Sequence, residues 1–478
     1  MNQIKKTISW IALSLALACG ACSDFLKEAS QDEVIVQTVA DYSEFLLGSG
    51  YPQPAISIPY SVLYLVDDDV EINAARVTAN SNTVISARFG YFTWQPDMWE
   101  RVGATLGHGY DQTYERIMGC NAVLDHIDAA SGEQELRDKT KAEAYTIRAM
   151  LYWQLVNMFG EPYNENPGAP GVVLKLTSGL VEDGMKRSTV ADAYVQILAD
   201  LEAAERLFSA YPPTRGGYRV NLASVYILLS RVNLYMERWD EAITAANNAV
   251  RVSRGLTDYA SLVPRFYLTT YDLDEVEWLY GGGSFDLGNG MNTSGFSPSS
   301  ELLALYDPAD KRLELWFAPT LLEVYKKTTQ SARPSNTMRV SEAYLNRAEA
   351  LARKGGNDAA AIADLNELRR HRIPGYADVS ITDPARLLEA IYTERRLELC
   401  FEMHRWFDLR RHGMPAITHL YRETTEGDPW TRYTLNERDP LYTLPIPTSM
   451  IDHNMALEQN VSALGQERAG VPLSDTQP

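Results

Sequence analysis

Residues 394–413 read ERRLELCFEMHRWFDLRRHG, and this stretch decides the fold. It holds five arginines and four acidic residues, interleaved with aromatic residues and two histidines. We interpret 394–411 as one helix. Its spacing then places Leu397, Phe401, His404 and Phe407 on one face, with Cys400 beside them. The pattern predicts a helix whose apolar stripe faces the core.

The charged residues of this helix predict ion pairs. Four pairs of opposite charge lie three residues apart: Arg395 and Glu398, Glu402 and Arg405, Arg405 and Asp408, and Asp408 and Arg411. Neighbours at this spacing stabilise a helix surface by about 0.2–0.5 kcal/mol each. Glu398 and Glu402 carry like charges four residues apart, so we expect them to meet arginines from another helix.

Two functional readings of the same stretch are weaker. His404, Asp408 and His412 could hold a metal ion, but the segment lacks the HExxH pattern, and its arginines would repel a cation. Glu398 or Glu402 could act as an acid or base, but carboxylates among arginines stay ionised with a lowered pKa. We therefore predict a structural brace, with no catalytic residue, metal or cofactor.

The formal charge of the 478-residue chain is −19, which argues against nucleic acid as a partner because such a partner requires a cationic face. The N-terminus has the layout of a secretory signal: Lys5 and Lys6, then the apolar run ISWIALSLALA at 8–18. Eleven residues are too few for a helix that spans a bilayer. Residues 1–21 are thus a predicted signal peptide.

A cysteine directly after this signal resembles a bacterial lipobox, in which the thiol is acylated. Cys22 follows two small residues and is favoured over Cys19, which has the bulky Leu17 two positions before it. Acyl chains contribute about 0.8 kcal/mol per buried methylene, so acylated Cys22 would anchor the chain to a membrane. Cys120 and Cys400 lie in helical patterns and are expected to be buried thiols, with a disulfide between them as the alternative.

Most of the remaining chain has helical periodicity, as in 114–127, 142–160 and 188–208. Residues 226–250 and 344–368 share one plan: a tyrosine-led helix, a short turn and an alanine-rich helix. Such pairs are typical of tetratricopeptide-like repeats. Residues 50–103, 258–335 and 420–478 lack this periodicity. Long irregular loops on a helical scaffold usually carry function, so we expect the ligand there.

The stretch at 394–413 resembles the C-terminal signature of the RagB/SusD family of outer-membrane lipoproteins, close to E-R-x-x-E-x-x-F-E-G-x-R-W-x-D-L-x-R. Ten residues match: Glu394, Arg395, Glu398, Phe401, Glu402, Arg405, Trp406, Asp408, Leu409 and Arg411. Met403 replaces the frequent glycine, which should be harmless on a helix. CSDFL (22–26), YERIMGCNAVLD, AEAYTIRAMLYWQLVNMFGEPY and LYTLPIPTSMIDHNMALEQN resemble further family landmarks in the same order.

The resemblance implies an all-α-dominated fold. This is a right-handed superhelix of tetratricopeptide-like pairs, with irregular loops and short β-hairpins that form the ligand face. It implies a single domain over 22–478, with a helical scaffold at about 104–256 and 338–413. The ligand-binding regions would be about 50–103 and 258–335. It also implies a non-catalytic lipoprotein of the cell surface that captures glycan for a SusC-like TonB-dependent outer membrane transporter.

Candidate ligand-binding residues lie in the two irregular regions, because sugar rings stack on aromatic planes and their hydroxyls need polar partners. The aromatic candidates are Tyr91, Trp94, Trp99, Trp278, Tyr280 and Phe285. The polar candidates are Asp67, Asp68, Asp69, Arg88, Asn289 and Asn292. Each aromatic could instead pack in the core, and the three aspartates could instead bind calcium. Trp94 is the preferred platform because its loop contains proline.

Three other functions remain open at this point. Relatives on the same scaffold capture peptides, and a negatively charged chain would suit cationic ones. A secreted glycoside hydrolase would need two carboxylates about 5–10 Å apart across a cleft. A plain tetratricopeptide scaffold for protein partners would leave the long aromatic loops without a purpose.

Overall fold

The computed structural model describes residues 36–52, 63–73, 84–101, 109–212, 218–263, 268, 270–281, 295–317, 324, 336–423 and 429–474. The signal peptide and Cys22 lie outside these residues. Cys120 and Cys400 are buried thiols, as predicted.

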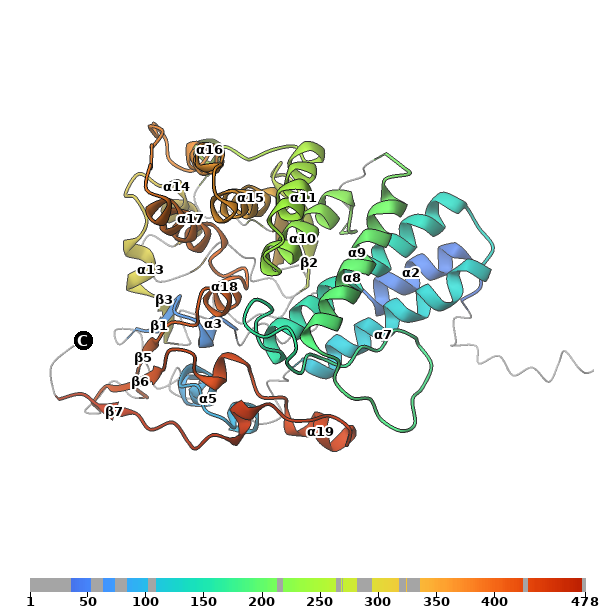
Figure 1. Ribbon diagram of the computed structural model, residues 1–478, viewed down its shortest axis with the longest axis horizontal. Helices are drawn as coiled ribbons and strands as arrows, with labels where there is room; N and C mark the ends of the chain where they lie inside the picture. The colour runs from blue at the N-terminus through green and yellow to red at the C-terminus, as the bar shows by residue number, and fades with distance from the viewer. Residues whose placement is uncertain are drawn as a thin grey trace, which may run out of the picture.

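Helices dominate the described chain (Figure 1). The long ones are α2 (Val39–Ser49), α7 (Tyr110–His126), α8 (Gln134–Phe159), α9 (Val190–Phe208), α10 (Leu222–Tyr235), α11 (Trp239–Val252), α15 (Val340–Lys354), α16 (Asp358–Arg370) and α17 (Pro384–Leu399). The short ones are α3 (Leu63–Val66), α5 (Phe89–Phe92), α6 (Met98–Arg101), α13 (Ser300–Ala304), α14 (Lys311–Trp316), α18 (Arg405–Arg411) and α19 (Thr448–His453). The three helices predicted from periodicity are confirmed as α7, α8 and α9. Thr189 caps α9 in a reciprocal capping box with Asp192.

The repeated plan is also confirmed, as the antiparallel pairs α10–α11 and α15–α16. Each pair turns through left-handed backbone, at Glu237 (φ 58°) in the first pair and at Gly355 and Gly356 (φ 78° and 73°) in the second. Glycine adopts this conformation without steric cost, which explains the GG of the second turn. α11 packs against α15, so the two pairs stack side by side, as expected of repeats that cannot bury their apolar faces alone (Figure 1).

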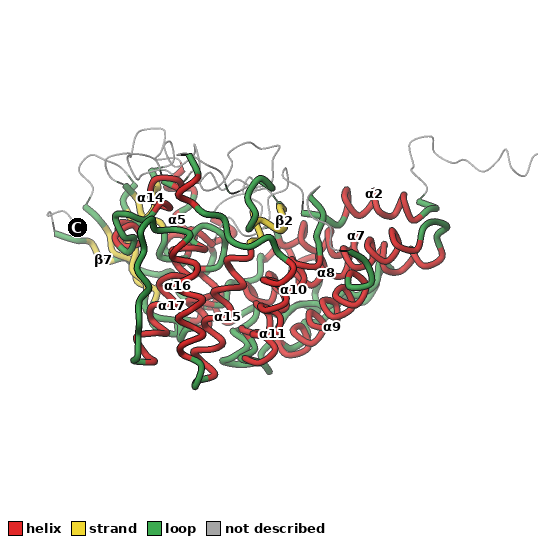
Figure 2. The backbone as a smooth tube through the Cα atoms, turned by 90° about the horizontal axis from the view of Figure 1, so that it is seen from above, coloured by secondary structure: helices red, strands yellow, loops and turns green. Residues whose placement is uncertain are grey.

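Strands join segments that are far apart in the sequence, which differs from the predicted hairpins. β1 (Val70–Ile72) pairs with β3 (Phe296–Pro298), and β2 (Val276–Tyr280) pairs with β4 (Asn336–Arg339), both antiparallel. β5 (Ile417–Tyr421) and β6 (Thr431–Leu435), in contrast, pair as consecutive strands, and β7 (Val471–Pro472) extends that sheet by pairing with β6. Seen from above, β2, α5 and α14 lie along the same edge of the molecule (Figure 2). The irregular regions therefore converge next to the helical repeats.

The helix predicted over 394–411 is wrong in one respect, because it is interrupted. α17 ends at Leu399, and α18 begins at Arg405. Between them, Phe401 and Met403 adopt left-handed backbone, with φ of 58° and 67°. Helical periodicity could not reveal this turn, because the residues on both sides of it are buried as predicted. Met403 is therefore not a harmless helical replacement, since the family's glycine would relieve this conformation.

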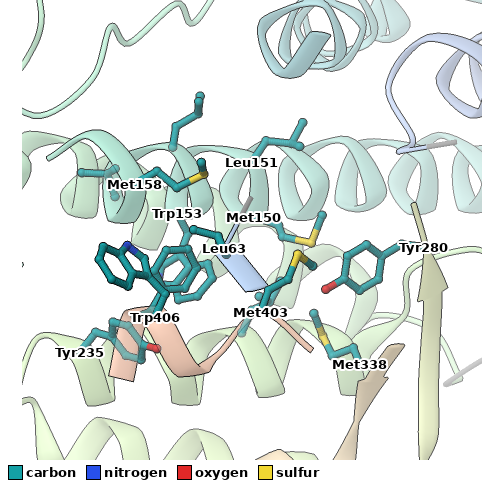
Figure 3. Packing of buried hydrophobic residues seen from close by; sticks show 14 of the residues in the cluster. Leu63, Met150, Leu151, Trp153, Met158, Tyr235, Tyr280, Met338, Met403 and Trp406 are labelled. Carbon is teal, nitrogen blue, oxygen red and sulfur yellow. The ribbon is translucent and has the colours of Figure 1, made fainter. Parts of the chain in front are cut away.

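The turn at Met403 gives a testable prediction. Met403 is buried in the core beside Met150 and Met338 (Figure 3). Met403→Ala and Met403→Gly both remove its packing, so both should be less stable than the wild type. We expect Met403→Gly to be more stable than Met403→Ala by about 1 kcal/mol, because only glycine avoids the left-handed strain. Urea denaturation of the two variants measures the difference, and a less stable glycine variant would contradict the strained turn.

Glu398 lies at the centre of a buried ion-pair network. Its carboxylate accepts hydrogen bonds from Arg372 at 2.7 and 2.9 Å, from Arg312 at 3.0 Å and from Arg339. All four side chains are completely buried. Burial alone would raise the pKa of Glu398, but Arg372, Arg339 and Arg312 outweigh it and hold the pKa well below its ordinary value. The expectation that this glutamate meets arginines from another helix is confirmed for Arg312 of α14, whereas Arg339 lies on strand β4 and Arg372 follows the end of α16.

Of the four predicted surface pairs, only that between Asp408 and Arg411 is present, at 2.9 Å. The other charges reach across the fold. Arg395 donates to Asp408 at 2.8 Å, and Arg405 donates to Asp68 at 2.6 Å. Arg411 donates to Glu349 of α15 at 2.7 Å. The segment thus joins the repeats to the N-terminal irregular region, which confirms that it is a brace.

Candidate functional site

Trp94 does not fit the role of a stacking platform. Its side chain is completely buried, and its indole lies on His419 of β5, with ring centres 4.2 Å apart and planes 24° apart. The indole N–H donates to the carbonyl of Val66 at 2.9 Å. A ring enclosed in this way has no face available to a sugar. The prediction for Trp94 is therefore wrong, and the alternative of core packing applies.

Tyr91 and Trp99 are likewise part of the core, with 4% and 8% of their surface exposed. Their rings meet edge to face at 5.4 Å. The indole N–H of Trp99 donates to the carbonyl of Pro445 at 2.7 Å. The proline-containing loop was expected to expose an aromatic platform, but it is packed against the C-terminal segment.

The acidic triplet at 67–69 is used for structure. Asp68 pairs with Arg405, and Asp69 accepts from Arg396 at 2.8 Å. Burial would raise the pKa of Asp68, but Arg405 and Arg396 lower it to about 2. Asp67 is buried, and its carboxylate accepts from the main-chain N–H of Asp69 at 3.0 Å. Neither predicted alternative, glycan acceptors or a calcium site, fits these residues, because Asp68 and Asp69 are paired with arginines and Asp67 is buried.

Trp278 and Tyr280 of β2 also belong to the core, at 0% and 5% exposure. Their rings stack with centres 4.7 Å apart, and Tyr51 meets Trp278 edge to face at 6.1 Å. The prediction that these two residues stack on a ligand is therefore wrong for the same reason as for Trp94. Both faces of this strand are buried, so no side chain of β2 is left open to a ligand.

Four predicted candidates remain: Arg88, Phe285, Asn289 and Asn292. Arg88 is half-buried at the start of α5, and its guanidinium donates to the carbonyl of Val84 at 3.2 Å. Phe285, Asn289 and Asn292 lie outside the described residues, in 282–294, between β2 and β3. Their role in ligand binding stays a prediction.

One aromatic pair next to β2 remains accessible, and the sequence analysis did not single it out. Tyr218 is 52% exposed and meets the half-buried Tyr271 edge to face, with ring centres 5.8 Å apart. Tyr218 has left-handed backbone (φ 62°), and its carbonyl accepts from the indole of Trp278 at 3.3 Å. Tyr271 accepts from the main-chain N–H of Leu279 at 3.1 Å. The pair is therefore anchored on β2 with one ring open to solvent.

The left-handed backbone of Tyr218 supports this tyrosine pair as a candidate ligand site. A tyrosine in left-handed backbone costs about 1–3 kcal/mol, and such residues cluster where a ligand is held. Tyr218 follows two glycines, and Tyr271 lies in TTYDLD. An aromatic next to turn residues was the only sequence signal for either of them. We call Tyr218 and Tyr271 the β2 aromatic pair.

In the part of the chain that the structure describes, no three acidic, histidine or cysteine side chains come together in a way that could hold a metal ion. None of the helices in the same residues is both long and apolar enough to cross a bilayer.

The fold defines a helical-repeat protein with an irregular, aromatic-bearing face. Two family models match the sequence of this chain. The family described as SusD matches residues 322–462, and the family described as starch-binding associating with outer membrane matches residues 25–234. Together they cover most of the sequence, and the chain belongs to the SusD/RagB family. The fold prediction is thereby confirmed for its class. The chain is a non-catalytic member of a family of binding proteins.

Individual proteins that resemble this chain also belong to SusD-type families. The chain is 23% identical to SusD-like protein P25 of Formosa agariphila, over 93% of this chain and 96% of that protein. It is 23% identical to SusD-like protein P2 of the same organism, over 63% of this chain and 70% of that protein. A SusD superfamily structure from Bacteroides thetaiotaomicron superposes with a TM-score of 0.70 at 23% identity, covering 88% of this chain and 99% of that one. A SusD-like carbohydrate binding protein from Bacteroides vulgatus gives 0.65 at 21% identity, covering 88% and 97%.

Proposed function

We propose that the chain is a cell-surface lipoprotein, anchored in the outer membrane through Cys22, which binds glycan and delivers it to a SusC-like TonB-dependent transporter. The β2 aromatic pair carries the proposal. It offers an exposed ring at the irregular face of a SusD-family chain, whereas five of the six aromatics predicted first are buried: Tyr91, Trp94, Trp99, Trp278 and Tyr280. The family description and a carbohydrate-binding structural neighbour support glycan as the ligand.

The chemistry of such a site requires little more than a ring and polar neighbours. The C–H faces of a sugar pack on the face of an aromatic ring, and its hydroxyls pair with polar side chains. Tyr218 would supply the ring, with Tyr271 holding it edge to face. Arg88, Asn289 and Asn292 remain the proposed polar contributors.

Calorimetric titration of the chain from Cys22 onward with a panel of soluble polysaccharides and peptides tests the proposed function. We expect saturable binding to at least one polysaccharide, with no sugars released on prolonged incubation. Release of sugars would replace the proposal with glycoside hydrolysis. Binding of peptides alone would replace it with peptide capture.

A substitution in the β2 aromatic pair tests the site itself. Tyr218→Ala removes the exposed ring but keeps a non-glycine residue in the left-handed position, so its stability should match that of the wild type. We expect glycan affinity to fall about tenfold, which corresponds to about 1.4 kcal/mol. Tyr344→Ala, at a half-buried tyrosine of α15, is the matched control and should leave affinity unchanged. Equal affinities for both variants would place the glycan elsewhere.

A further inference from the structure

A groove of about 370 Å³ lies over α10, between α9 and α11. Four side chains with little exposure form its apolar floor: Leu198, Tyr226, Leu229 and Ala245. Four carboxylates line it: Glu202, Glu205, Asp240 and Glu241. The groove lies in the helical repeats and contains none of the residues of the β2 aromatic pair.

The side-chain amide of Asn233 has an unsatisfied hydrogen-bond acceptor in this groove. Its side chain is 5% exposed, and its amide N–H donates to the carbonyl of Leu229 at 2.8 Å. The amide oxygen is buried and accepts no hydrogen bond within the described chain. A buried acceptor left without a donor costs about 1–3 kcal/mol. A ligand that brings an N–H group into the groove would remove this cost.

Only two of the four carboxylates that line the groove form ion pairs with cations of the described chain. Arg238 pairs with Glu241 at 2.9 Å, and Lys354 of α15 pairs with Asp240. Glu202 and Glu205 lie three residues apart on α9, and no ion pair joins either of them to a residue in the described ranges. The Tyr226 hydroxyl donates a hydrogen bond to the carboxylate of Glu205, which leaves the other lone pairs of that carboxylate open. The groove therefore combines two carboxylates and one amide oxygen, all hydrogen-bond acceptors, above an apolar floor.

We propose that this groove binds a lysine or arginine side chain carried by an extended segment of a partner protein. The aliphatic stem would lie along Leu198 and Leu229, while the cationic head would reach Glu202, Glu205 and the amide oxygen of Asn233. A divalent ion fits less well, because it needs oxygen ligands on all sides and the floor is apolar. This interaction is separate from glycan capture and does not depend on it.

Fluorescence anisotropy with labelled tetralysine, at about 150 mM salt to screen distant charges, tests the groove. We expect Glu202→Gln/Glu205→Gln to weaken binding about tenfold. Glu115→Gln/Glu389→Gln removes the same number of charges at exposed positions of α7 and α17, and should change affinity less than twofold. Labelled tetraglutamine should not bind the wild type.

A second variant blocks the groove without touching its acceptors. Thr244 is an exposed lining residue of α11, so Thr244→Lys should fold normally and place a competing cation beside Glu202 and Glu205. We expect it to abolish saturable tetralysine binding, with an unchanged thermal melt. Equal weakening by the two double variants, full binding to Thr244→Lys, or equal binding of tetraglutamine would each overturn the proposal.

Discussion

Replacing Glu398 with glutamine is expected to lower the free energy of unfolding by about 3–5 kcal/mol. The carboxylate lies among Arg312, Arg339 and Arg372, all of which are completely buried. Glutamine keeps the shape of the side chain but removes the charge and converts one acceptor into a donor that faces guanidinium groups. Three buried cations are then undercompensated, which is much more costly than the loss of a surface ion pair.

Glu389→Gln is the matched control, because Glu389 lies on the same helix, α17, but is exposed. It should change stability by less than about 0.5 kcal/mol. Chemical denaturation followed by circular dichroism measures both variants. If Glu398→Gln is as stable as the control, the network does not hold the fold together and the segment is not a brace.

Trp94→Ala is expected to cost about 3–5 kcal/mol of stability, as for other large core aromatics. The substitution leaves a cavity beside His419 and removes the hydrogen bond from the indole to Val66. It therefore acts on folding and not on glycan recognition. Thermal denaturation and glycan titration of the same preparation separate the two effects.

Tyr218→Ala provides the contrast for Trp94→Ala, because it removes an exposed ring from the same irregular face. We expect Tyr218→Ala to lose affinity with stability retained, and Trp94→Ala to lose stability. A Trp94→Ala variant that melts like the wild type but no longer binds glycan would restore Trp94 as the platform and contradict the structure.

The helical scaffold could be predicted because its signals are local. The stripes of α7, α8 and α9 and the repeated pairs each follow from spacing within one segment. The charged stretch could be recognised as structural for the same reason, since arginines surround every carboxylate. Its turn could not be predicted, because Phe401 and Met403 leave the helix while keeping buried side chains.

The candidate site could not be predicted residue by residue. Whether a loop aromatic packs inward depends on elements far along the chain: His419 and Pro445 cover Trp94 and Trp99. The acidic triplet looked like a ligand site because Arg396 and Arg405, its partners, lie more than 300 residues away. Tyr218 was missed because a single tyrosine between two helices carries no periodic signal.

Hydrogen–deuterium exchange with and without a bound glycan tests most directly the division of the molecule into a brace and a binding face. The structure predicts that glycan slows exchange in the peptides that contain Tyr218 and residues 270–281, and leaves residues 394–412 unchanged. Protection centred on 394–412, with none near Tyr218, would show that the charged segment binds ligand and would contradict the account.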